Sequence, residues 1–294
     1  MSAINQLKDI FSKGNSLIRL IYINIAVYIV LQLMFIIFRL FNNDFDLISC
    51  LALPADFAGI LHHPWTIVSY MFLHEQLFHI LFNMLALYWF GQLFLMFFSQ
   101  KQLVSLYLTG GFAGAIFYVA AYNIFPFFQP VLNQSLLMGA SGSIMAIIVA
   151  SAMQSPNMAM RVIFIGEVKL KYIAAFAVLT SIFGITSNNA GGEIAHLGGA
   201  LTAYIFIVSL RQGTDITKGL NKIIDAVYDL FRPRKLKVSS TKKPGNQKMS
   251  DAEFNVYKAR KMEEIDKILD KIKTSGYESL SADEKKKLFE QGKK

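Results

Sequence analysis

The chain has 294 residues, of which 54% are hydrophobic and only 17% are charged, and it contains 25 Phe. This composition indicates a membrane protein and argues against an ordinary water-soluble domain. The formal net charge of +9 is uneven, because residues 1–210 carry 8 Lys and Arg against 7 Asp and Glu, so most of the excess lies in residues 211–294. The single cysteine, Cys50, excludes an intramolecular disulfide and a cysteine-based metal cluster.

Six apolar stretches approach the length of about 20 residues that a helix needs to cross a bilayer core of about 30 Å. In chain order they are about 18–38, 77–98, 102–124, 138–154, 170–187 and 194–210. The fourth and fifth are short and contain Gly, Ser and Thr, which is typical of buried spans rather than lipid-facing ones. We therefore expect an all-α membrane protein built as a bundle of six transmembrane helices.

The connecting loops predict which side of the membrane each faces. The loop between the first and second spans, about 39–76, is long and apolar, and we expect short helices at or in the outer leaflet. Basic residues precede the first span, lie between the second and third and between the fourth and fifth, and are dense after the sixth. The opposite loops are acidic, with Arg39 as their only basic residue. Both termini are therefore predicted to be cytoplasmic.

The segment HEQLFHILFN, residues 74–83, leads into the second span, and its histidines are one residue further apart than in the H-E-x-x-H helix of zinc peptidases. On a helix His74 and His79 point about 140° apart, too far to hold one ion together. No metal site is predicted here. His79 and Asn83, in contrast, are four residues apart and share one face.

Polar residues recur at one depth of the predicted bundle. The second, fourth and sixth spans all run from the outside to the inside, and each has polar side chains within its first two turns: His79 and Asn83, then Ser141, then His196. They lie about 10 Å below the outer surface. Ionisable groups inside spans are costly, so this level is the predicted functional site.

The fourth span surrounds Ser141 with Gly139, Ala140 and Gly142. So little side-chain bulk permits either tight helix packing or the close approach of a substrate backbone. The residues of this span alone do not decide between the two.

The sixth span carries His196 followed by Gly199 and Ala203, a pair of small residues that permits close packing against a neighbouring helix. If that neighbour is the fourth span, His196 reaches Ser141. A serine with an imidazole partner is the minimum for an activated nucleophile. The alternative is a histidine bonded to a backbone carbonyl.

In combination, these motifs resemble those of the rhomboid family of intramembrane serine proteases. The resemblance covers about residues 15–210, and His74, the six spans and the long apolar loop also fit it. The motifs that carry it are His79-xxx-Asn83, Gly139-Ala140-Ser141-Gly142, and Ala195-His196 with Gly199.

The resemblance implies a role for each site residue. Ser141 corresponds to the nucleophile and His196 to its general base, a dyad without an acidic third member. His79 and Asn83 correspond to side-chain donors of the oxyanion hole, together with the backbone N–H of Ser141. Donors fixed in a site of low dielectric constant stabilise such an oxyanion strongly.

The chain departs from the family pattern at three positions. Met145 stands where many members have an aromatic residue beneath the catalytic histidine. Thr66 follows Trp65 where many have arginine, and Ala203 replaces a glycine of the sixth span. None of these changes removes a reacting group.

The expected function is therefore an intramembrane serine endopeptidase that hydrolyses peptide bonds within or next to transmembrane segments of membrane proteins. The alternative is a catalytically silent rhomboid-like protein that binds membrane clients, and a small transporter is a third, weaker reading. The resemblance implies the plasma (inner) membrane of a bacterium, with transmembrane proteins and the lipid bilayer as partners. No cofactor, metal or nucleic acid is implied.

The C-terminal part has its own pattern. An amphipathic helix over residues 214–231, followed by basic residues, predicts an interfacial segment. Capping boxes at Ser250-x-x-Glu253 and Ser281-x-x-Glu284 open helices predicted at about 251–274 and 282–291. We thus divide the chain into a cytoplasmic N-terminus (1–17), a six-span protease domain (18–210), an interfacial helix and linker (211–249) and a cytoplasmic helical hairpin (250–294). Whether the hairpin binds a cytoplasmic partner is left open.

One further segment, residues 187–192, directly precedes the sixth span. Its Gly191-Gly192 pair permits movement, so we expect either a flexible cap over the site or a plain turn.

Overall fold

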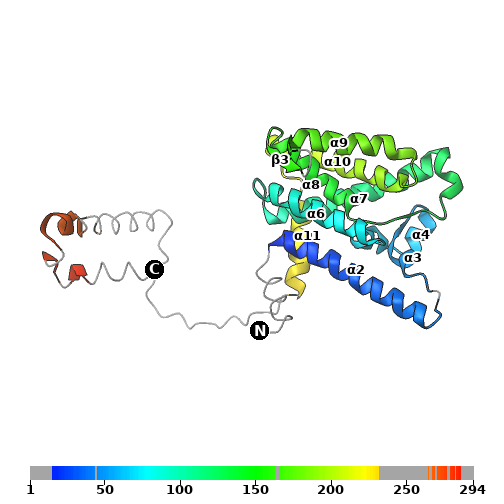
Figure 1. Cartoon of the computed structure of the whole chain (residues 1–294), viewed down its shortest axis with the longest axis horizontal. Helices are drawn as coiled ribbons and strands as arrows, with labels where there is room; N and C mark the ends of the chain where they lie inside the picture. The colour runs from blue at the N-terminus through cyan, green and yellow to red at the C-terminus, as the bar shows by residue number, and fades with distance from the viewer. Residues whose placement is uncertain are drawn as a thin grey trace. The chain divides into compact units, whose positions relative to one another are not determined.

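The computed structural model describes residues 15–43, 45–162 and 166–231, and in the C-terminal part residues 264, 267–268, 270–276, 279–281 and 283–285. The chain divides into two compact units, Met1–Arg232 and Pro233–Lys294. The first unit holds the membrane-type helices and is the larger of the two (Figure 1).

The expected helical membrane bundle is confirmed. Four helices are long and apolar enough to cross a membrane: α2 (Ser16–Leu40), α6 (Leu77–Leu95), α7 (Gln100–Ile124) and α10 (Ala190–Arg211). The other two predicted spans are shorter apolar helices, α8 (Ser141–Gln154) and α9 (Leu170–Phe183). Fourteen helical residues extend about 21 Å, so α8 and α9 are shorter than a bilayer core of about 30 Å.

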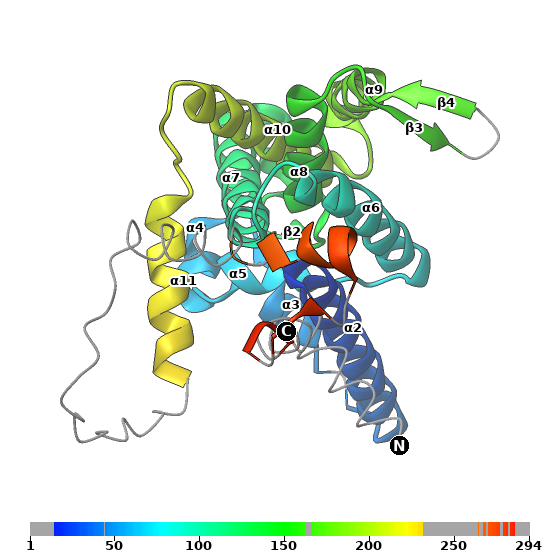
Figure 2. The ribbon, with the colours of Figure 1, turned by 90° about the vertical axis from the view of Figure 1, so that its left-hand side faces the viewer.

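Helix α10 packs mainly against α7 and α8, and these three form the centre of the bundle (Figures 1 and 2). Helix α2 lies at the edge, next to α6 and α7, and only 11% of its most apolar stretch is buried. Its buried residues, Leu17, Leu20 and Asn24, are all near its start. The C-terminal half of α2 therefore presents its apolar side chains to the surroundings of the protein, as a lipid-facing helix would.

Two adjacent glycines explain why α10 sits so close to both neighbours. A Cβ atom on Gly198 would lie 2.6 Å from the carbonyl oxygen of Ala113 on α7, and one on Gly199 would lie 2.0 Å from the carbonyl oxygen of Gly142 on α8. Cβ atoms essentially never come within 3.0 Å of another heavy atom. Larger residues would thus force the helices apart. The close packing expected at Gly199 is confirmed, and the neighbour at this glycine is the fourth span, α8.

The first loop folds into short helical segments, as expected. They are α3 (Leu47–Leu51), α4 (Phe57–His62), α5 (Thr66–Ser69) and the 3₁₀ helix η1 (Tyr70–Phe72). Asp46 and Asp56 cap α3 and α4 through hydrogen bonds to backbone N–H groups.

Internal hydrogen bonds hold this loop together. The Trp65 indole donates to the carbonyl oxygen of Cys50 (2.8 Å), and the Ser69 hydroxyl donates to that of Leu51 (2.6 Å). Thr66, which departs from the family pattern, donates its hydroxyl to the carbonyl oxygen of His63 (2.6 Å). The loop is thus bonded internally without an arginine at this position.

A two-stranded antiparallel sheet ties the first loop to the segment before the fourth span. It pairs β1 (Leu53–Pro54) with β2 (Leu136–Leu137). The 3₁₀ helix η2 (Pro126–Val131) lies between α7 and β2 in the chain. On the opposite end of the bundle, β3 (Ala159–Val162) and β4 (Gly166–Lys169) form a hairpin between α8 and α9 (Figures 1 and 2).

Helix α11 (Lys218–Phe231) begins four residues later than predicted, because Asp215 forms a turn with Thr217 instead of joining the helix. Its first turns are bonded to α7: Lys101 forms an ion pair with Asp225 (2.8 Å), and the hydroxyl of Ser105 donates to Asn221 (2.6 Å). The helix is amphipathic, as predicted, and its interfacial position stays a prediction.

The C-terminal unit is described in part. Glu284 accepts from the backbone N–H of Ser281 (2.7 Å) and its own N–H donates to the Ser281 hydroxyl (3.3 Å), so the second capping box forms as predicted. Gly276, with φ +75°, ends the preceding helical stretch, as a C-terminal glycine does. The box predicted at Ser250 and Glu253 lies outside the described residues.

Candidate active site

Ser141 is the first residue of α8, and the backbone before it is fixed by two contacts. Gly139 has φ +126°, a conformation that favours glycine. Its N–H donates to the carbonyl oxygen of Tyr70 in the first loop (2.9 Å). A Cβ atom on Gly139 would lie 3.0 Å from Cε1 and 3.1 Å from Nε2 of His79, and 3.8 Å from the Ser141 hydroxyl oxygen. The imidazole of His79 and the hydroxyl of Ser141 therefore flank this glycine.

The close contact between α8 and α10 lies directly beside Ser141. A Cβ atom on Gly142 would lie 3.2 Å from the carbonyl oxygen of Ala195, the residue before His196. Together with the approach of Gly199 to the Gly142 carbonyl, this places the first turn of α8 against the second turn of α10. The serine and histidine predicted from separate spans thus adjoin one helix–helix contact.

The Ser141 hydroxyl is partly exposed and forms no hydrogen bond with any of the residues that the structure describes. The serine–imidazole hydrogen bond is therefore not formed in this state. Such bonds are often long or absent in free enzymes and shorten only when substrate is bound.

The ring of His196 is held by two contacts at one of its nitrogen atoms. Its Nδ1 atom lies 3.0 Å from the hydroxyl oxygen of Ser181 on α9 and 3.2 Å from Oε2 of Glu193 on α10. The side chains of His196 and Glu193 are 18% and 22% exposed. Neither partner was predicted from the sequence, although the Glu-x-x-His spacing on a helix indicates one of them.

His79 and Asn83 lie on one face of α6, as predicted, and the amide of Asn83 donates to the carbonyl oxygen of His79 (2.9 Å). This bond uses one of the two amide hydrogens, so the second remains for another acceptor. Asn83 is 8% exposed and His79 is half-buried. Of the two, His79 adjoins Gly139, which lies two residues before Ser141.

His74 is buried, with 3% of its surface exposed. Its ring packs edge-to-face on His79, with ring centroids 5.1 Å apart. Burial, and secondarily the neighbouring His79, lower the pKa of His74 to about 4. His74 is therefore neutral at physiological pH and supports the imidazole of His79. Among the described residues, no three His, Cys, Asp or Glu side chains are grouped as a metal site.

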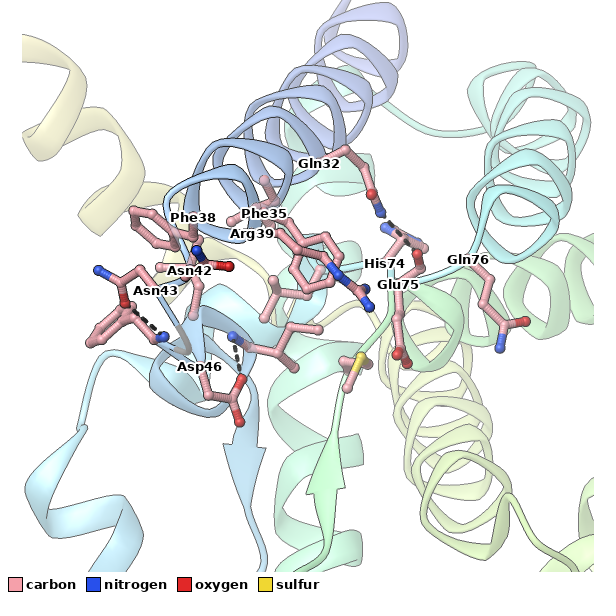
Figure 3. Close-up of a pocket in the computed structure, with 16 residues that line it drawn as sticks. Gln32, Phe35, Phe38, Arg39, Asn42, Asn43, Asp46, His74, Glu75 and Gln76 are labelled. Atoms are coloured by element: carbon pink, nitrogen blue, oxygen red, sulfur yellow. Dashed lines mark hydrogen bonds between the residues drawn. The ribbon is translucent and has the colours of Figure 1, made fainter.

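A cavity of about 780 Å³ lies between the C-terminal end of α2 and the first loop (Figure 3). Polar side chains line much of it, and the Gln32 amide donates to the carbonyl oxygen of Glu75 across it (3.0 Å). It reaches His74 and Met138, each of which adjoins a residue of the candidate site, but its lining does not include Ser141 or His196. The cavity thus borders the site from the side of α2.

The expectation of a flexible glycine cap is wrong. Gly191 and Gly192 lie in the first turn of α10, which begins at Ala190. A Cβ atom on Gly191 would lie 2.9 Å from the ring of Tyr118, and one on Gly192 would lie 2.7 Å from the side chain of Asn189. These glycines serve close packing, and the segment before them is a plain turn.

Comparison with known proteins gives three matches. Residues 61–213, about half of the chain, match the model of the rhomboid domain, and residues 249–294 match a family of unknown function, DUF6576. The chain is also similar to RHOMBOID-like protein 12, mitochondrial, of Arabidopsis thaliana, with 29% identity over 189 residues. That alignment covers 61% of this chain and 55% of the relative, so the chain spans about half the length of this relative. All four predicted site residues lie within the matched rhomboid domain.

Proposed function

The chain belongs to the rhomboid family of membrane proteins, and from this premise we propose that it is an intramembrane serine endopeptidase. Its substrates are membrane proteins that it cuts within or next to a transmembrane segment. Ser141 acts as the nucleophile and His196 as the general base, without cofactor or metal.

The proposed reaction begins when the Ser141 hydroxyl oxygen attacks the carbonyl carbon of the scissile peptide bond. Nε2 of His196 takes the hydroxyl proton and then delivers it to the leaving amine as the carbon–nitrogen bond breaks. Water hydrolyses the resulting acyl-enzyme with His196 again as the base. This regenerates the free Ser141 hydroxyl.

The tetrahedral intermediate needs hydrogen-bond donors for its oxyanion. Ser141 opens α8, and Ala140 before it provides no capping side chain. The first N–H groups of α8 therefore remain available to an anion, where the helix dipole also favours negative charge. We assign the same task to the side chains of His79 and Asn83, so that donors from two helices converge on one oxygen.

The observation that carries this proposal is the position of Ser141. It stands at an uncapped helix N-terminus, beside the α8–α10 contact, and next to a helix whose histidine is held by its Nδ1 atom. A serine that served packing alone would need neither the positive φ at Gly139 nor a histidine fixed in this way.

We further propose that the protein resides in the bacterial plasma membrane with both termini in the cytoplasm. The basic residues of the β3–β4 hairpin and of the chain after α10 support this orientation. The first loop, α3 to η1, then faces the outside together with Ser141. The proposal keeps the division of the chain at residues 18, 211 and 250 into N-terminus, protease domain, interfacial helix with linker, and helical hairpin.

The test compares the purified wild type with Ser141→Ala and His196→Ala, using a fluorescent transmembrane substrate in liposomes, with and without EDTA. We expect cleavage by the wild type that resists EDTA and is abolished in both variants. Cleavage that survives Ser141→Ala would refute the serine mechanism. No cleavage of any of several substrates would favour the alternative of a client-binding protein, which the name of the Arabidopsis relative leaves open.

A further inference from the structure

We propose that Glu193 is a positioning residue for His196, assisted by Ser181, and that the protein therefore works with a third, acidic member beside its serine and histidine. This inference rests on the proposed function. It goes beyond the predicted dyad, for which no acidic partner was expected.

The geometry around Nδ1 of His196 is specific. Glu193 approaches it from within α10, three residues earlier, at 3.2 Å, while Ser181 approaches it from α9 at 3.0 Å. Ser181 is 1% exposed, so its hydroxyl is shielded from water. Two polar groups from two different helices thus meet at Nδ1, the ring nitrogen that does not take the proton in the proposed reaction.

The carboxylate decides which ring nitrogen carries the proton. An ionised carboxylate only accepts hydrogen bonds, so its partner Nδ1 must be protonated. Glu193 lies in the first turn of α10, where the helix dipole favours the ionised form. The lone pair of His196 is then on Nε2, where a general base for Ser141 needs it. When Nε2 takes the Ser141 proton, the carboxylate also stabilises the resulting imidazolium.

The fold holds the carboxylate in place. A Cβ atom on Gly184, at the end of α9, would lie 2.7 Å from Cγ and 3.0 Å from Cδ of Glu193. The stem of Glu193 is therefore pressed against the α9 backbone and cannot swing away on that side. The other imidazole of the candidate site, that of His79 on α6, lies on the far side of Gly139 from the Ser141 hydroxyl rather than at Nδ1 of His196.

The decisive variant is Glu193→Gln, which keeps the size of the side chain but removes its charge. We expect kcat to fall about 10- to 100-fold with little change in KM. This loss is smaller than the roughly 10⁴-fold loss of kcat that follows when a fully buried triad carboxylate becomes an amide, because Glu193 is partly exposed. Without the carboxylate the imidazolium is less stable. The acidic limb of the kcat–pH profile should therefore move to lower pH.

Two further variants separate positioning from folding. Glu193→Asp retains the charge and should restore the acidic limb to its wild-type position together with part of kcat. Glu167→Gln makes the same chemical change at an exposed position of the β3–β4 hairpin and should behave as the wild type. The rate at which a fluorophosphonate probe labels Ser141 provides a second measurement that does not depend on a peptide substrate.

The outcomes are distinct for the two proposals. If Ser141→Ala still cleaves, the proposed function itself is wrong. If Ser141→Ala is inactive but Glu193→Gln has the wild-type kcat, labelling rate and pH profile, the role of Glu193 is refuted. The role of Glu193 would also be refuted if Glu193→Gln and Glu193→Asp lost activity equally and neither shifted the acidic limb. A purely structural role predicts this result.

Discussion

Replacing Gly199 with alanine tests whether the α8–α10 contact sets the geometry of the site. The added methyl group would lie 2.0 Å from the carbonyl oxygen of Gly142, and at least 3.0 Å is needed. The two helices must therefore separate by about 1 Å, at a typical overpacking cost of about 1–3 kcal/mol. A displacement of this size between reacting groups lowers the rate by about 100-fold.

The adjacent glycine provides a matched control. A methyl group at Gly198 collides with the carbonyl oxygen of Ala113 on α7, at 2.6 Å, on a different side of α10. Gly198→Ala should therefore destabilise the protein without separating α10 from α8. Gly219→Ala on α11, where an added methyl group meets nothing within 4 Å, controls for the substitution itself.

The assay measures cleavage of a transmembrane substrate per mole of folded enzyme, with folding checked by thermal unfolding in detergent. We expect Gly199→Ala to lose far more activity per folded molecule than Gly198→Ala at comparable thermal stability. Gly142→Ala, which meets the Ala195 carbonyl oxygen at the milder distance of 3.2 Å, serves if Gly199→Ala does not fold. Equal activity of Gly199→Ala and Gly198→Ala would refute the reasoning.

Three further predictions concern stability. Ser99→Ala removes the capping box that Ser99 and Gln102 form at the start of α7 and should lower the free energy of unfolding by about 1 kcal/mol, measured by denaturant titration. Tyr70→Phe removes the hydroxyl that donates to the Gly111 carbonyl oxygen (2.5 Å) and should cost about 1–2 kcal/mol in the same measurement. The pKa of His74 is about 4 in the folded protein against 6.5 when unperturbed, so the unfolded chain takes up a proton first as the pH falls. The free energy of unfolding should therefore be highest above about pH 6.5 and fall by roughly 3 kcal/mol as the pH is lowered to 4. His74→Phe should flatten this pH dependence, and an unchanged slope would contradict it.

The sequence contained enough information to predict most of the bundle. Six apolar segments correspond to six helices, because an apolar stretch of this length has few alternatives to a helix in a bilayer. The contact of α8 with α10 was also predictable, since Gly199 is a small residue one turn from His196. The two short strand pairs were not predicted, since pairs of two residues leave no periodic pattern in a sequence.

The environment of His196 was harder to predict for a specific reason. The sixth span was expected to begin at residue 194, which left Glu193 among the charged residues of a loop. The helix begins at Ala190, and this puts Glu193 on the same face as His196. The role of Ser181 depends on how α9 packs on α10, and no local pattern in the sequence encodes that contact.

The pairing of β1 with β2 also has a consequence for how this protein assembles. Residues distant in the chain must meet before the backbone at Gly139 acquires its final conformation, since Leu53 pairs with Leu137 and the Tyr70 carbonyl accepts from the Gly139 N–H. Contacts between distant segments close slowly, because the loop between them must first be ordered. Helix α8 can thus be inserted and helical while its first residue is not yet oriented. During biosynthesis the orientation of Ser141 would therefore be fixed late, after the first loop and the segment before α8 have paired.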